Sequence, residues 1–123
     1  FLLVGIGGAL GSMARYGAGV LVGRLWPAVF PLGTLLINIT GSLAMGLFVG
    51  FLARTTPAWQ ADARLFVAVG VLGGYTTFSA FSLDAIVLIE RGEIGSALLY
   101  VGVSVLVSIV ALYLGLLLVR GPA

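Results

Sequence analysis

The stretch GGYTTFSAFS, residues 73–82, decides the fold, because it places a poor helical sequence inside an apolar run. That run, Leu65–Leu83, carries no charge, and Ala85–Ile89 extends it beyond Asp84. Paired Gly residues followed by β-branched Thr and by Ser are unfavourable in a helix interior. In a membrane, a break exposes backbone groups that lipid cannot satisfy, so they must face protein, water or an ion. We therefore predict a helix broken at the Gly pair, where half-helix N-termini favour an anion and freed carbonyls favour a cation.

The composition is typical of an integral membrane protein. Of the 123 residues, 61% are hydrophobic and 8% are charged, and the mean hydropathy is +1.25. Soluble domains carry about 25% charged residues. Because the chain has no Cys, no His and only four acids, disulfides, zinc sites and general acid–base catalysis are nearly excluded. We expect no enzymatic activity, no organic cofactor and, with a net charge of +2, no nucleic acid partner.

Charged residues divide the chain into four apolar runs. The runs are Phe1–Gly23 with Arg15 inside it, Phe30–Ala53, Leu65–Leu83 followed by Ala85–Ile89, and Ile94–Val119. A membrane span needs ~20 apolar residues, so residues 1–123 are predicted to form a single four-helix transmembrane domain. The predicted loops are Arg24–Phe30, Arg54–Arg64 and Glu90–Glu93. The nineteen Gly residues indicate close helix packing or broken helices.

The first run is expected to be a span rather than a cleaved signal peptide. It has no basic segment in front of it, and Arg15 interrupts its apolar residues. Because the chain starts at Phe1, we expect a few residues to precede it.

The loop charges do not set one orientation. With four spans both termini share a side, which holds Arg54, Arg64 and Arg120, while the other side holds Arg24 and Arg91. Three against two is almost no positive-inside bias. Either preceding residues carry the deciding charge, or the chain inserts in both orientations and dimerises antiparallel. Four helices leave little room for a pathway, which favours an oligomer.

Polar residues follow one face of the second span. Thr34, Asn38 and Ser42 are spaced four residues apart, so they share a helical face. Small polar residues alone are typical of helix packing. An amide with two N–H donors is harder to satisfy in lipid, so Asn38 favours an anion ligand.

A second polar stripe lies on the fourth span, where Ser96, Tyr100, Ser104 and Ser108 repeat the same spacing. Hydroxyls donate to anions, so the stripe indicates an ion track. The alternative is small-residue packing, because a Ser hydroxyl can donate to the carbonyl four residues earlier.

The third span adds aromatic and charged candidates. Phe78 and Phe81 share a face, and the positive edges of their rings can hold an anion weakly. Arg15 and Asp84 are the charges inside spans, each toward one end of its helix. Arg15 either attracts anions to a pore mouth or pairs with an acid or the interface, and Asp84 is either a vestibule group or a surface acid.

Three motifs together resemble the Fluc (CrcB-type) fluoride channels. They are GGALG at 7–11 with Arg15-Tyr16, Gly33-Thr34-Leu35 with Asn38 and Gly41, and GGYTTFSAF at 73–81. The resemblance covers the whole chain. It implies a dual-topology antiparallel homodimer in the bacterial plasma or inner membrane, which exports fluoride passively through two pores, excludes chloride and gives fluoride resistance.

The resemblance also implies roles for single residues. It makes Asn38 the pore asparagine and gives Phe78 and Phe81 ring edges that meet fluoride. Other pore residues implied by the matching motifs are Thr34, Thr77, Ser79, Tyr100, Ser104 and Ser108. Arg15 and Asp84 match groups near the pore mouth. Carbonyls of Gly73 and Thr76 from two subunits would hold a structural Na⁺ at the dimer centre, and Ala80 departs from relatives that have Thr there.

Fluoride suits such a site, because a small, strongly hydrated ion needs donors at close quarters in place of water. Two other functions stay open. A four-helix proton-coupled exporter of hydrophobic cations needs a carboxylate deep in a helix, and Asp84 lies close to a helix end. A non-transporting assembly subunit would use the polar stripes only for packing and would tolerate Asn38→Ala.

Overall fold

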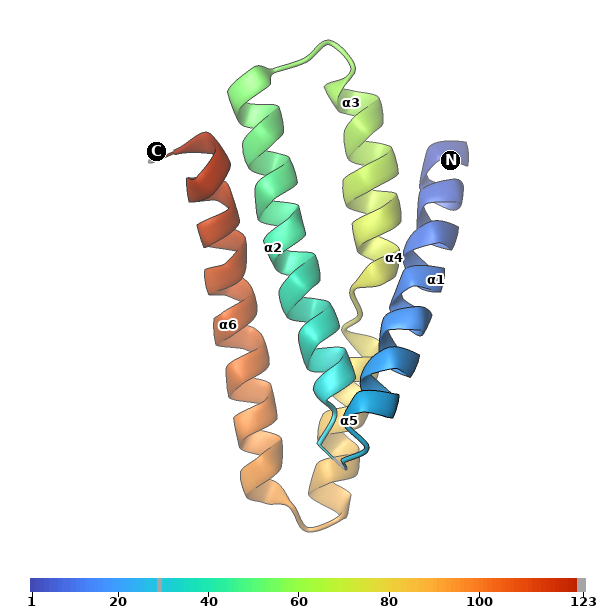
Figure 1. Ribbon diagram of the computed structural model, residues 1–123, viewed down its shortest axis with the longest axis vertical. Coiled ribbons are helices and arrows are strands. Elements are labelled where there is room, and N and C mark those ends of the chain that lie inside the picture. Colours follow the sequence, from blue (N-terminus) through green and yellow to red (C-terminus); the bar gives the residue numbers. More distant parts are fainter. Residues whose placement is uncertain (29, 122–123) are drawn as a thin grey trace.

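The protein is a bundle of long helices, seen in a computed structural model that describes residues 1–28 and 30–121 (Figure 1). Its elements are α1 (Leu2–Leu25), α2 (Leu32–Thr55), α3 (Gln60–Ala63), the π-helical η1 (Arg64–Leu72), α4 (Gly73–Tyr75), α5 (Ser79–Glu90) and α6 (Ile94–Arg120). The predicted all-α class is confirmed for this part of the chain. Residue 29, in the predicted loop Arg24–Phe30, and residues 122–123 lie outside it.

The helices alternate in direction along the bundle. Figure 1 shows the N- and C-terminal ends of the chain at the same end of the bundle, together with the α2–α3 connection. The α5–α6 loop lies at the opposite end, where Gly92 adopts φ +80°, a conformation that favours glycine. The prediction that both ends share one side is therefore confirmed for the described arrangement.

Three segments are long and apolar enough to cross a membrane. Within the described residues these are Leu32–Thr55, Gln60–Glu90 and Ile94–Arg120. Helix α1 has 24 residues, which is sufficient length, but it holds seven Gly residues and Arg15, which lower its hydropathy. Three of the four predicted spans are thus confirmed by length and composition, and the insertion of α1 stays a prediction.

Glycines let the helices pack closely in two pairs, α1 against η1 and α4, and α2 against α6. A Cβ on Gly74 would lie 2.6 Å from the carbonyl oxygen of Gly8. A Cβ on Gly115 would lie 2.7 Å from the carbonyl oxygen of Leu43. Because these neighbours are backbone atoms, a side chain there has no space to enter. The predicted use of glycine for close packing is confirmed at these positions.

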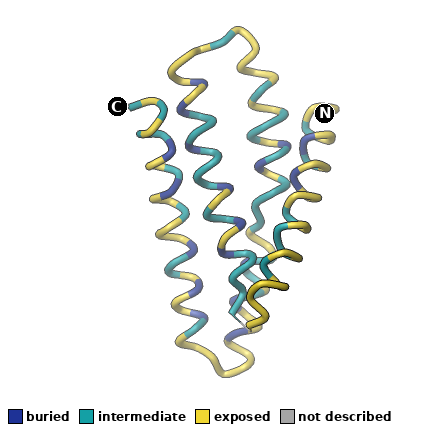
Figure 2. The backbone as a smooth tube through the Cα atoms, in the orientation of Figure 1, coloured by how far each residue is buried: buried dark blue, intermediate teal, exposed yellow. Residues whose placement is uncertain are grey.

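The main buried cluster lies where α2, α5 and α6 meet. Its members are Leu35, Phe81, Ala85, Leu88, Ala97 and Tyr100. Elsewhere buried residues occur singly along the helices, between intermediate and exposed ones (Figure 2). Large apolar side chains such as Leu98 and Leu106 are among those exposed residues. An apolar exterior is what a bilayer requires of a membrane bundle.

The third helix is broken, but not at the glycines. Gly73 and Gly74 remain helical in α4, and the extended residue is Thr76 with φ −80° and ψ 160°. The break therefore covers Thr76–Phe78, between α4 and α5. The prediction of a break at the Gly pair is wrong in position, because Gly74 is needed for close contact with α1. The π-helical winding of η1 was not indicated by the residue pattern.

Candidate ion pathway

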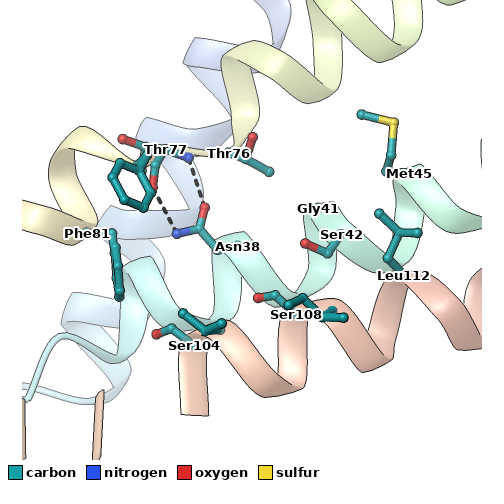
Figure 3. A pocket seen from close by; sticks show the side chains of 13 residues that line it. Asn38, Gly41, Ser42, Met45, Thr76, Thr77, Phe81, Ser104, Ser108 and Leu112 are labelled. Carbon is teal, nitrogen blue, oxygen red and sulfur yellow. Dashed lines mark hydrogen bonds between the residues drawn. The ribbon is translucent and has the colours of Figure 1, made fainter. Parts of the chain in front are cut away.

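A cavity of about 350 Å³ lies between α2, the break and α6 (Figure 3). Its lining combines side-chain amide and hydroxyl groups with apolar groups. The lining residues are Asn38, Gly41, Ser42, Met45, Thr76, Thr77, Phe78, Phe81, Ser104, Val105, Ser108, Ile109 and Leu112. The structure thus brings residues of the second, third and fourth predicted spans together around one space.

The Asn38 amide faces the break. Its Nδ2 donates to the carbonyl of Thr77 at 2.9 Å, and the N–H of Thr77 donates to its Oδ1 at 2.8 Å. Figure 3 shows both bonds as dashed lines between α2 and the extended segment. An amide nitrogen carries two N–H groups, so one N–H of Asn38 remains for another acceptor.

Two hydroxyls of the cavity have no hydrogen-bond partner among the described residues. These are Ser104 Oγ and Ser108 Oγ, and both atoms are buried. A buried polar atom without a partner costs about 1–3 kcal/mol, so a bound ion or water would stabilise both. Neither hydroxyl donates to the carbonyl four residues earlier in this structure. The alternative of small-residue packing along this stripe stays open.

The two phenylalanines lie at the break with different exposure. Their ring centroids are 5.6 Å apart. Phe81 is 8% exposed and packs against Tyr100, with centroids 5.2 Å apart. Phe78 is 78% exposed although it also lines the cavity. The Phe81 ring is thus buried in the core of the chain, and the Phe78 ring lies on its surface.

The Thr77 hydroxyl caps the helix that follows the break. It accepts a hydrogen bond from the N–H of Ala80 at 3.1 Å, as side-chain oxygens do at helix N-termini. The exposed Ser79 hydroxyl lies 3.4 Å from the same oxygen. Ser79 is therefore at the start of α5, beside the residues that line the cavity and not among them.

A second cavity, of about 410 Å³, lies between α1, α2 and α5. It contains the two charged residues that were predicted inside spans. Its lining residues are Arg15, Tyr16, Gly19, Val20, Pro31, Gly33, Thr34, Ile37, Thr77, Ala80 and Asp84. Thr77 lines both cavities, so the break forms part of the wall between them.

The two charged side chains of the second cavity, Arg15 and Asp84, form hydrogen bonds that the sequence did not predict. The Nε of Arg15 donates to the carbonyl of Gly74 at 3.0 Å. The carboxylate of Asp84 accepts a hydrogen bond from the hydroxyl of Tyr100 at 3.1 Å. Tyr100 has no exposed surface, so it lies in the core beside the cavities rather than on the lining of either one.

The two residues predicted as cation ligands, Gly73 and Thr76, lie at the two ends of α4. In a continuous helix the N–H of Thr77 would donate to the carbonyl of Gly73, but it donates to Asn38 instead. The Gly73 carbonyl thereby loses its helical donor, and Thr76 lies in extended backbone outside α4. Carbonyl oxygens are suitable ligands for a hard cation. Among the described residues no group of three or more His, Cys, Asp or Glu side chains offers an alternative.

Several lining residues were not among the predicted site residues. Ser42 shares the helical face of Asn38, so its spacing of four already indicated its position. Tyr16 lies next to Arg15 in the second cavity. The apolar part of the first cavity, which includes Met45 and Leu112, had no signal in the sequence, because apolar residues occur on every face of these helices.

The fold and cavities define a class, a multi-pass membrane protein with two cavities beside a broken helix. Residues 2–116 match the family model described as "CrcB-like protein, Camphor Resistance (CrcB)". The chain belongs to this family.

Relatives named "Fluoride-specific ion channel FluC" are similar over nearly the whole chain. The relative from Hyphomonas neptunium is 51% identical over 98% of this chain and 94% of its own length. The relative from Paracoccus denitrificans is 54% identical over 98% of this chain and 94% of its own length. A relative named "Fluoride-specific ion channel FluC 2", from Nitrobacter hamburgensis, is 53% identical over 98% of this chain and 96% of its own length.

Proposed function

We propose that this protein is a fluoride-selective channel that lets fluoride leave the cytoplasm passively, and so gives fluoride resistance. The observation that carries the proposal is the first cavity, whose described lining offers amide and hydroxyl donors and no charged side chain. The names of its relatives indicate that the ion is fluoride. An ion channel is not an enzyme, and we assign no catalytic residue.

Fluoride must exchange its water shell for donors at close quarters. The unpartnered hydroxyls of Ser104 and Ser108, with the remaining N–H of Asn38, can supply such donors. The ring edges of Phe78 and Phe81 add weak positive potential. Because none of these groups carries a full positive charge, binding stays weak enough for the ion to leave.

Groups around the second cavity would deliver the ion. The guanidinium of Arg15 lines that cavity and raises the local concentration of anions. Thr34 and Thr77 line it as well. Asp84 is hydrogen-bonded to Tyr100. In this arrangement the Tyr100 hydroxyl orients the Asp84 carboxylate at the wall of the second cavity. Ser79 lies at the start of α5, beside the first cavity.

We further propose that the channel is an antiparallel homodimer with two pores. Phe78 is 78% exposed in a single chain, although an aromatic side chain of a pore needs a second wall. The nearly balanced loop charges allow insertion in both orientations. A second copy placed against Phe78 would supply the missing wall.

We also propose a structural Na⁺ at the dimer centre, with carbonyls of Gly73 and Thr76 as ligands. The loss of the helical donor to Gly73 and the extended backbone at Thr76 support this assignment. When bound, Na⁺ supplies positive charge that neutralises these carbonyl dipoles and biases the local field toward anions. The chain's own contribution is to hold those two carbonyls outside the helical hydrogen-bond ladder.

Efflux from liposomes tests the ion selectivity. Purified protein in liposomes loaded with fluoride or chloride should release fluoride rapidly and retain chloride, as ion-selective electrodes would record. Protein-free liposomes are the control. If dimeric, folded protein releases no fluoride, the channel proposal is wrong, and proton-coupled transport of hydrophobic cations becomes the function to test.

Loop charges test the dimer. Three arginines inserted beside Pro57 should force one orientation, because added basic residues hold a loop in the cytoplasm. The yield of active dimer should then fall strongly. Co-expression with a variant that carries three arginines beside Gly92, on the opposite side, should restore it. Full activity of either variant alone would contradict antiparallel assembly.

A further inference from the structure

The side chain of Asn38 pairs with the backbone of Thr77 in both directions. It donates to the Thr77 carbonyl at 2.9 Å and accepts from the Thr77 N–H at 2.8 Å. The two residues are 39 positions apart in the sequence. A side-chain amide has the same donor and acceptor groups as a peptide bond. Asn38 therefore bonds to Thr77 in the way that a neighbouring backbone would (Figure 3).

These two bonds begin where the helical ladder ends. The N–H of Thr76 still donates to the carbonyl of Leu72, at 3.0 Å. The next N–H, that of Thr77, is taken by Asn38. An unbonded peptide group in a membrane protein costs free energy, and the pairing with Asn38 removes that cost for Thr77. Asn38 thus stabilises the chain in its broken form.

Thr77 in turn fixes the elements around it. Its hydroxyl caps α5 through the N–H of Ala80. It precedes Phe78, and it lines both cavities. A displacement of Thr77 would therefore move three features together: the start of α5, the exposed ring of Phe78 and the wall between the two cavities.

We propose that Asn38 is the positioning residue of the broken helix, which holds the segment Thr76–Phe78 in place through the backbone of Thr77. This role is additional to any contact between its remaining N–H and an ion. The positioning role depends on hydrogen bonds to the Thr77 backbone and is the same whichever ion the protein carries. A residue that served only as an anion ligand could be removed without releasing Thr77.

Amide hydrogen exchange measured by NMR on the intact protein tests this role. In the wild type the Thr77 N–H should be protected like a helical N–H, although it lies outside the helices. Asn38→Ala should raise its exchange rate at least about tenfold, because the N–H loses its acceptor beside water-accessible cavities. The N–H of Ala80 should also exchange faster.

Two further variants separate positioning from other roles. Asn38→Asp keeps an oxygen that accepts from the Thr77 N–H in either protonation state, so protection should return toward the wild-type level. Ser42→Ala is the matched control, since Ser42 lines the same cavity one turn later on α2. It should leave exchange at Thr77 unchanged.

The proposal is overturned if the Thr77 N–H of Asn38→Ala exchanges at the wild-type rate or more slowly. It is also overturned if the Thr77 N–H exchanges as fast in Asn38→Asp as in Asn38→Ala. An effect of Ser42→Ala equal to that of Asn38→Ala also overturns it. If Asn38→Ala does not fold, the exchange rate of the Thr77 N–H in the wild type still tests the proposal. Exchange of its Thr77 N–H as fast as that of an unbonded surface amide would show that Asn38 does not hold the segment.

Discussion

Replacing Phe78 by isoleucine is expected to lower fluoride efflux from liposomes at least about tenfold, the rate change for ~1.4 kcal/mol of lost stabilisation. Isoleucine keeps an apolar side chain but removes the positive ring edge. Since Phe78 is 78% exposed in the single chain, the change removes little packing within the subunit. Fluoride-electrode traces at equal protein content, with circular dichroism as a check on folding, would measure the effect.

Phe51→Ile is the control for this substitution. Phe51 is 38% exposed near the end of α2, where its ring lies 6.2 Å from that of Trp59. It is not among the lining residues of either cavity. Efflux by this variant should match the wild type. If Phe78→Ile also conducts at the wild-type rate, the ring edge of Phe78 has no part in conduction.

Gly115→Ala should unfold or strongly destabilise the bundle. The new Cβ would lie 2.7 Å from the Leu43 carbonyl oxygen and 2.8 Å from the Leu47 nitrogen. Both are backbone atoms of α2, so relief requires the two helices to separate. Overpacking of this kind costs about 1–3 kcal/mol. The folded fraction in detergent, followed on heating, should show a midpoint well below that of the wild type.

Gly102→Ala is the matched control in the same helix. A Cβ at Gly102 meets nothing within 4 Å. Alanine also has the higher helix propensity of the two residues. Its thermal midpoint should equal or exceed that of the wild type. A similar loss in both variants would mean that α6 is sensitive to any added side chain, and that the close approach at Gly115 is not the cause.

Most of the helices follow directly from residue pattern. The fourth apolar run was predicted as Ile94–Val119, and α6 covers Ile94–Arg120. The second was predicted as Phe30–Ala53, and α2 covers Leu32–Thr55. Run length and charge position suffice here, because a charged residue in hydrocarbon is costly wherever the rest of the fold lies. The first run also forms a helix, α1 (Leu2–Leu25), and its insertion into the membrane stays a prediction.

The break shows where local reasoning ends. Weak helix formers at residues 73–82 indicated that the third helix breaks, and it does. Propensity favoured the Gly pair as the point of breakage. The structure instead keeps Gly74 helical against Gly8 and breaks the helix over Thr76–Phe78, where Asn38 bonds to Thr77. Propensity scores each residue alone, whereas the partner of Thr77 lies 39 residues away.

The sequence alone determined that this protein lies in a membrane, that polar faces run along its second and fourth apolar segments, and that its third helix is interrupted. These properties depend on composition and on helical periodicity, which are local. Only the tertiary structure decided that Thr77 separates two cavities and that Tyr100 is buried against Asp84. Those facts depend on which helices are neighbours. Which helices pack together depends on close contacts at glycines and on hydrogen bonds between residues far apart in the sequence. Neither produces a periodic pattern that can be recognised in the sequence.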